Sequence, residues 1–85
     1  MDKQEAIQQL KSMGLRITPQ RQEILEILLQ ECHQSAEEIH QKVRHKFPHI
    51  SLDTVYRNLN KLNELGFLSS IQLQDHKMRY EFNTP

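Results

Sequence analysis

The segment from residue 51 to residue 65 constrains the fold of this 85-residue chain more than any other stretch. Its apolar residues recur at steps of three and four, at Leu52, Val55, Leu59, Leu62 and Leu65. This period places them on one stripe of an α-helix, and such a stripe must be buried. The flanking Ser51 suits an N-cap, and Gly66 suits a left-handed C-terminal cap. We therefore expect a helix with defined ends and one face against a core.

The opposite face of this helix carries side chains that can read DNA bases. The set is Thr54, Tyr56, Arg57, Asn58, Asn60 and Lys61. Arginine can bond bidentately to guanine and asparagine to adenine, and methyl or aromatic edges can contact thymine. The face is typical of a recognition helix. Polar outer faces are also the rule for soluble helices, so an ordinary surface helix is the alternative.

Three further helices are expected before this segment. Apolar residues at helical spacing predict the first over residues 3–13, closed by a glycine. A Thr-Pro pair predicts the start of a second helix, with a wide apolar face, over residues 19–31. A third follows the Ser-x-x-Glu capping box over residues 35–38 and is stopped by Pro48. The short connection to residue 51 predicts helix-turn-helix geometry.

After the helix at 51–65 the apolar period changes to two residues. Alternation over residues 67–73 and again over 78–83 predicts two strands. The polar residues 74–77 predict the hairpin loop between them, with the turn type left open. The expected fold is therefore mainly α with a small antiparallel β-hairpin, the plan of a winged helix-turn-helix domain. The wing would present His76, Lys77 and Arg79 to phosphates or to a minor groove.

Composition limits the classes of function. Eleven basic and eleven acidic residues give a formal net charge of zero, which alone argues weakly against a nucleic-acid binder. The basic residues, however, flank an acidic middle segment, and a fold could gather them on one face. No apolar run approaches the length that crosses a bilayer, so no membrane partner is expected. The N-terminus lacks a secretory signal, so we expect a cytoplasmic protein.

An enzyme is one rival class. Cys32 is the only cysteine, which excludes an internal disulfide and a Cys-x-x-Cys zinc or redox centre. It neighbours His33, but adjacent residues project in different directions and do not make a nucleophile and its base. No nucleophile elbow, phosphate loop or His-Glu-x-x-His motif is present. We therefore expect no catalysis.

The histidines at positions 40, 45 and 49 do not share a helical face, and we expect them to be surface residues. A second rival class is a winged helix used for protein contact. Tyrosine and arginine are favoured at protein hot spots, so Tyr56 and Arg57 would suit that role as well.

Four blocks of sequence, Leu15–Arg21, His33–Ile39, Ile50–Leu59 and Arg79–Phe82, follow one another in an order and spacing that resembles the N-terminal half of ferric uptake regulator (Fur) family proteins. The resemblance covers almost all of the chain. It implies that residues 1–85 are the winged-helix DNA-binding domain of a metal-responsive transcriptional repressor, without the C-terminal metal-binding and dimerisation domain. The repressor would dock as a homodimer on an A·T-rich palindromic operator in double-stranded DNA.

The resemblance also implies roles for single residues. Tyr56 would contact thymine, Arg57 would contact a guanine or a phosphate, and Arg16 would lie near the minor groove, where narrow A·T tracts attract arginine. The other candidates for DNA contact are Arg21, Thr54, Asn58, Lys61 and Lys77. A solvated helix surface is the alternative for Arg21, Asn58 and Lys61.

A regulatory divalent metal, Fe, Mn or Zn, is implied for the full-length protein. His33 and Glu81 match two of its ligand positions, and the histidine pair that would complete the site would follow Pro85. One imidazole and one carboxylate cannot close a metal shell, so no cofactor is expected in this chain. The alternative is a surface histidine and a solvated glutamate.

The residue at position 81 bears on the signal that is sensed. A glutamate there is similar to the iron-responsive members, whereas peroxide sensors often carry aspartate. We therefore expect an iron response. A peroxide-sensing or other metal-sensing regulator of the same family is the alternative.

Overall fold

The computed structural model describes residues 2–72 and 74–83. Within these ranges the helices are α1 (Lys3–Ser12), α2 (Pro19–Gln30), α3 (Ala36–Val43) and α4 (Leu52–Glu64). The strands are β1 (Gln34–Ser35), β2 (Leu68–Gln72) and β3 (Met78–Phe82). None of the described helices is long and apolar enough to span a membrane.

The polar caps predicted at three helix starts are confirmed. The side chains of Thr18, Ser35 and Ser51 each accept a hydrogen bond from the backbone N–H three residues later. Each bond satisfies one of the amides that a helix start leaves unpaired. Gly66 closes the end of α4 with a φ of 83°, the left-handed conformation that glycine adopts without a Cβ penalty.

The third helix is shorter than the sequence predicts. It ends at Val43, and residues 44–46 form turns in which two amides bond to carbonyls three residues back instead of four. This tighter winding brings Phe47 and Ile50 onto the core. The prediction that Pro48 stops the helix is therefore wrong, because the chain leaves the helical path four residues earlier to bury these two side chains.

The predicted hairpin belongs to a three-stranded antiparallel sheet with the order β1-β3-β2. β2 and β3 pair with Ser70 opposite Tyr80, and β1 pairs with the other edge of β3, with Gln34 opposite the same tyrosine. The sequence did not predict β1, since two residues carry no period-two signal. The predicted extension of the first wing strand to Leu73 lies outside the described residues.

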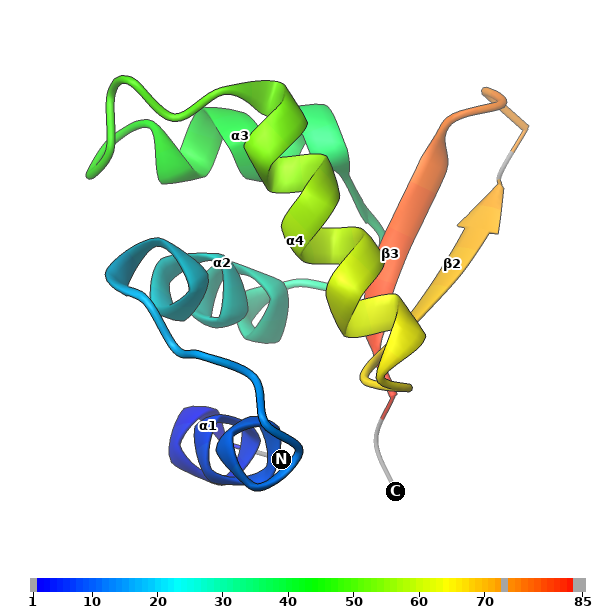
Figure 1. Cartoon of the computed structure of the whole chain (residues 1–85). Coiled ribbons are helices and arrows are strands. Elements are labelled where there is room, and N and C mark those ends of the chain that lie inside the picture. Colours follow the sequence, from blue (N-terminus) through cyan, green and yellow to red (C-terminus); the bar gives the residue numbers. More distant parts are fainter. Residues whose placement is uncertain (1, 73, 84–85) are drawn as a thin grey trace.

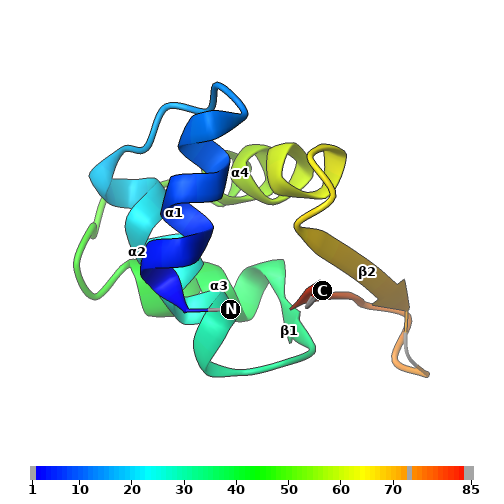
Figure 2. The same cartoon turned by 90° about the horizontal axis from the view of Figure 1, so that it is seen from below.

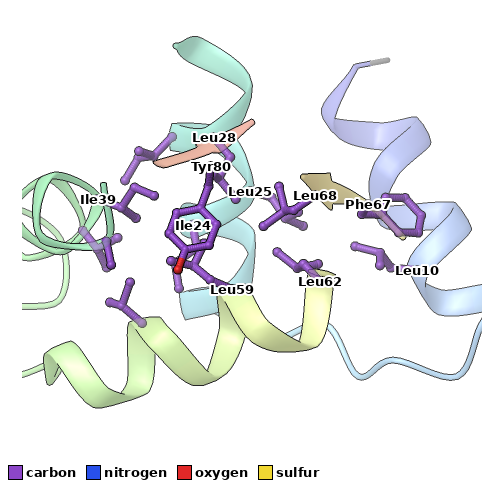
Figure 3. Close-up of a cluster of buried hydrophobic side chains, with 14 of the residues drawn as sticks. Leu10, Ile24, Leu25, Leu28, Ile39, Leu59, Leu62, Phe67, Leu68 and Tyr80 are labelled. Atoms are coloured by element: carbon purple, nitrogen blue, oxygen red, sulfur yellow. The ribbon is translucent and has the colours of Figure 1, made fainter. Parts of the chain in front are cut away.

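One core joins the helices to the sheet. Its fully buried side chains come from all four described helices and from β2, and include Leu10, Ile24, Leu25, Ile39, Leu59 and Leu68. Figure 3 shows Tyr80 of β3 lying among them. The middle of the predicted apolar stripe of α4, Val55, Leu59 and Leu62, is buried, whereas Leu52 and Leu65 at its ends are only partly buried. Met13 departs from its predicted stripe: it follows the end of α1 and is 50% exposed.

The helices and the wing occupy different sides of the molecule. Figure 1 shows α2 lying between α1 and α3, with α4 crossing from the α3 side toward the sheet. In Figure 2 the β2–β3 hairpin extends away from the helices. The fold is a winged helix, in which α3, the following loop and α4 form the helix-turn-helix.

Candidate nucleic-acid interface

Arg57 is an exposed residue on the outer face of α4. Its side chain is 80% exposed on α4, and its Nη2 lies 3.0 Å from Oδ2 of Asp53, one turn earlier on the same face. An ion pair between two exposed side chains at this spacing is weak. A guanine edge or a phosphate can therefore compete with Asp53 for the guanidinium.

Tyr56, the next residue of this face, is held by a neighbouring helix. The ring is half-buried against the core, and the hydroxyl donates a hydrogen bond to Oε1 of Glu37 in the first turn of α3, at 3.2 Å. Burial raises the pKa of Tyr56, and the charge of Glu37 raises it further. The pKa of Glu37 is lowered, first by its own backbone amide and then by the Tyr56 hydroxyl. This contact fixes where the phenol group lies.

Asn58 does not lie on the outer face of α4, and that prediction is wrong. Its side chain is only 8% exposed and accepts a hydrogen bond from Nε of Arg21 at 2.7 Å. The Asn58 amide nitrogen donates to the carbonyl of Thr54 at 2.9 Å. The sequence carried a signal for this placement, because Asn58 lies three residues after Val55 and four before Leu62, within the buried stripe.

Arg21 is likewise part of the scaffold. Besides its bond to Asn58, its Nη1 donates to the carbonyl of Arg16 at 2.6 Å. Arg21 is half-buried, so the predicted alternative of a solvated helix surface does not describe it. The network ties the connection before α2 to the middle of α4. It thereby fixes the segment that carries Arg16 relative to the face that carries Arg57.

The remaining predicted contacts are spread along the same elements. Thr54 is half-buried at the start of α4, and its hydroxyl accepts a hydrogen bond from Ser51 at 2.9 Å. Arg16 is exposed on the connection between α1 and α2, and Lys77 is exposed in the hairpin. Lys61 is exposed near the end of α4, with Nζ 3.8 Å from Glu64. The structure thus places these cations on the α1–α2 connection, near the end of α4 and on the hairpin.

Arg79 stabilises the wing and is not free to contact phosphate. Its side chain is 19% exposed and donates to Oε1 of Glu38 at 2.8 Å, to Oδ2 of Asp75 at 2.6 Å and to the carbonyl of His33 at 3.1 Å. The hydrogen bond from Arg79 holds the pKa of Asp75 below its ordinary value. Burial raises the pKa of Glu38, but hydrogen bonds from Ser35 and Arg79 outweigh it and leave the pKa lowered. The expectation that Arg79 lies open for DNA is therefore wrong.

The two residues predicted as metal ligands lie together. Nε2 of His33 is 3.1 Å from Oε2 of Glu81, and His33 adopts a positive φ of 60° just before β1. Among the described residues, no group of three or more His, Cys, Asp or Glu side chains could hold a metal ion. One nitrogen and one carboxylate oxygen do not fit a complete metal site. Their role as ligands stays a prediction.

His40 has a structural contact that sequence reasoning missed. It is half-buried, and its Nε2 donates to the carbonyl of Ile50 at 2.8 Å. The bond links α3 to the residue just before the N-cap of α4. His45 and His49 are exposed, as predicted.

This geometry can be compared with known proteins. The family model described as the ferric uptake regulator family matches residues 12–85. The chain belongs to the ferric uptake regulator family. Members of this family are transcriptional regulators and not enzymes, which confirms the expectation that the chain is not an enzyme.

Curated relatives in the Fur family include peroxide-responsive repressors. The chain is 40% identical over 82 residues to the peroxide-responsive repressor PerR of Staphylococcus epidermidis, covering 95% of this chain and 55% of that protein. The PerR of Staphylococcus aureus matches with the same identity and coverage. The chain therefore spans about half the length of the curated relatives it matches.

Solved Fur family structures share the fold. A structure of PerR from Streptococcus pyogenes superposes with a TM-score of 0.87 at 33% identity, covering 94% of this chain and 56% of that one. The ferric uptake regulator of Helicobacter pylori, described as having three functional metal binding sites, gives 0.78 at 32% identity, covering 93% and 53%. These neighbours confirm the predicted winged helix.

Proposed function

We propose that residues 1–85 are one sequence-specific DNA-binding domain of a transcriptional repressor that acts in the cytoplasm. The exposure of Arg57 beside Tyr56 carries the proposal, because the opposite face of α4 is buried and the helix has this one face to offer a partner. The second helix of a helix-turn-helix, when it exposes such groups, suits the major groove of double-stranded DNA.

The family resemblance suggests roles for individual residues, and their exposure supports several of these roles. Arg57 contacts a guanine or a phosphate, and Tyr56 contacts thymine. Thr54 lies beside them at the start of α4, and Arg16 enters the minor groove. Lys61 and Lys77 bind phosphates at the end of α4 and on the wing. Arg21 and Asn58 position these elements instead of touching DNA, since their polar groups already bond to protein.

The operator is an A·T-rich palindrome that two copies of the domain read in the full-length protein as a homodimer. Two linked modules gain affinity because the second binding event becomes intramolecular. The isolated domain contacts a half-site and binds with modest affinity.

The full-length protein responds to a divalent metal, Fe, Mn or Zn, and His33 and Glu81 contribute ligands to it. Glu81 favours an iron response through its resemblance to iron-responsive members. A peroxide response is the second candidate, supported by the 40% identity to repressors named as peroxide-responsive.

A binding titration in a salt series tests the proposal. The chain is titrated against an A·T-rich palindromic duplex and a scrambled duplex, with and without divalent metal. We expect preference for the palindrome and an affinity that falls steeply with salt, because phosphate contacts release counterions. Equal binding to both duplexes by the monomer and by a covalently dimerised form would contradict sequence-specific DNA binding and favour a protein partner for α4.

A further inference from the structure

The loop between α3 and α4 carries a concentration of basic side chains. Residues 44–49, here called the basic loop, contain no acidic residue. The basic side chains are Arg44, His45, Lys46 and His49, and all four residues are exposed. The whole chain has a formal net charge of zero, so the positive charge of this loop is a local concentration.

The basic loop is anchored to the core and to α3. Phe47 packs against the core, and Ile50 directly after the loop is buried. The amide of Ile50 donates to the carbonyl of Phe47 at 3.1 Å, and His40 donates to the carbonyl of Ile50 at 2.8 Å. Binding through a loop that is already ordered loses less conformational freedom than binding through a flexible one.

The loop lies next to the proposed DNA-reading face. It ends two residues before Ser51, the N-cap of α4, and Figure 1 shows it in green at the left, connecting the end of α3 to the start of α4. An open hollow lined by Gln20, Lys46, His49 and Ile50 places it beside the start of α2 as well. The Arg21–Asn58 bond joins this first turn of α2 to the middle of α4.

Acidic side chains of the protein neutralise only part of the positive charge of the basic loop. Nζ of Lys46 lies 3.3 Å from Oε1 of Glu23 on α2, while the lysine side chain stays largely exposed. Within the described residues Arg44 makes no ion pair. Among the described residues, the loop's two permanent cations, Arg44 and Lys46, therefore have one carboxylate partner, Glu23. An exposed ion pair of this kind is weak, so a phosphate can compete for the lysine.

We propose that the basic loop binds phosphates of the DNA duplex beside the groove that α4 enters. The inference rests on the proposed DNA-binding function and extends its contact surface. Arg44 and Lys46 supply charge, and His45 and His49 supply ring N–H donors. These contacts carry no base information, so they raise affinity for every duplex alike.

The test compares two double variants with the same change in net charge. Arg44→Gln/Lys46→Gln removes the two permanent cations of the loop. Lys3→Gln/Lys11→Gln removes two from α1, which Figure 1 shows on the far side of α2 from α3. Circular dichroism and urea unfolding verify that each variant keeps the fold. Affinity for the palindromic and scrambled duplexes is then measured over a salt series.

We expect the loop variant to bind both duplexes roughly tenfold more weakly, with the slope of log affinity against log salt reduced by about two and the ratio between duplexes unchanged. The α1 variant should change far less. Equal effects of the two variants, with the unaltered chain still binding, would overturn the role of the loop and leave the proposed function standing. Failure of the unaltered chain to bind either duplex would overturn both.

Discussion

The Tyr56 hydroxyl on α4 donates a hydrogen bond to Oε1 of Glu37 in the first turn of α3, at 3.2 Å. The neighbouring Glu38 accepts from Arg79 of the wing at 2.8 Å. The first turn of α3 therefore contacts both elements that are proposed to touch DNA. Glu37 holds Tyr56 of α4, and Glu38 holds Arg79 of the wing.

Replacing Glu37 tests the support of Tyr56. Glu37→Gln keeps an oxygen acceptor but removes a negative charge near the proposed DNA surface, so binding to both duplexes should strengthen a few-fold. Glu37→Ala also releases the phenol, and the preference for the palindrome should fall. If the alanine variant keeps the full preference, Glu37 does not position Tyr56.

The same substitution has a spectroscopic readout. Burial first, and then Glu37, raise the pKa of Tyr56, so the phenol should titrate at lower pH in Glu37→Gln than in the unaltered chain. The chain has two tyrosines, and a Tyr80→Phe background isolates the signal of Tyr56. Ultraviolet absorbance against pH measures the midpoint.

The bond between Arg21 and Asn58 should contribute to stability. Asn58→Ala leaves Nε of Arg21 without its acceptor in a half-buried site, and we expect the free energy of unfolding to fall by about 1–3 kcal/mol. Asn60, exposed on the same helix, provides the matched control. Asn60→Ala should change the free energy of unfolding by less than about 0.5 kcal/mol. Urea denaturation measures both. Equal values for the two variants would show that the network is not stabilising.

The wing should lose stability in acid through Arg79. Asp75 and Glu38 have lowered pKa values in the folded chain, relative to ordinary values of 3.8 and 4.5. A carboxyl with a lowered pKa stabilises the fold above its ordinary value, and that stabilisation is lost as pH falls through the folded value. Unfolding free energy should therefore drop between about pH 5 and about pH 2.

Arg79→Met should reduce this drop, since it removes the donor shared by both carboxylates. Lys11→Met, at an exposed position of α1, is the control and should leave the drop unchanged. The measurement is urea unfolding at several pH values. An equal acid dependence in the Arg79 variant and the control would argue against this role for the arginine.

DNA binding by the chain should not depend on metal. His33 and Glu81 lie 3.1 Å apart, but two donors do not complete a metal shell. We expect a chelator to leave the affinity for the palindrome unchanged, and His33→Ala to have no effect on it in the presence of zinc. If the unaltered chain binds the palindrome only with zinc, and His33→Ala loses that zinc-dependent binding, the chain alone forms a functional metal site.

The starts of α2, α3 and α4 were predictable because short-range chemistry decides them. Thr18, Ser35 and Ser51 cap helices through bonds that span three residues, and the sequence displays both partners. The end of α3 was not, because the chain leaves the helix before Pro48 as Phe47 packs against the core and Ile50 becomes buried, and this packing involves distant elements.

The candidate site was only partly predictable for a similar reason. The exposure of Arg57 follows from helical spacing alone. The burial of Arg79 depends on partners 41 and 46 residues away, Glu38 and His33, which no local pattern reveals. Asn58 lies between these cases, since its spacing indicated the buried stripe while its polarity suggested the surface.

The central claim, that α4 reads DNA sequence, is tested most directly by Arg57→Ala. The arginine is 80% exposed, so its removal should leave the fold and the urea midpoint intact. The ratio of affinities for the palindromic and scrambled duplexes, measured by titration at one fixed salt concentration, should fall by roughly tenfold or more. An unchanged ratio, with Lys11→Ala as the control for charge, would contradict the assignment of α4 as the recognition helix.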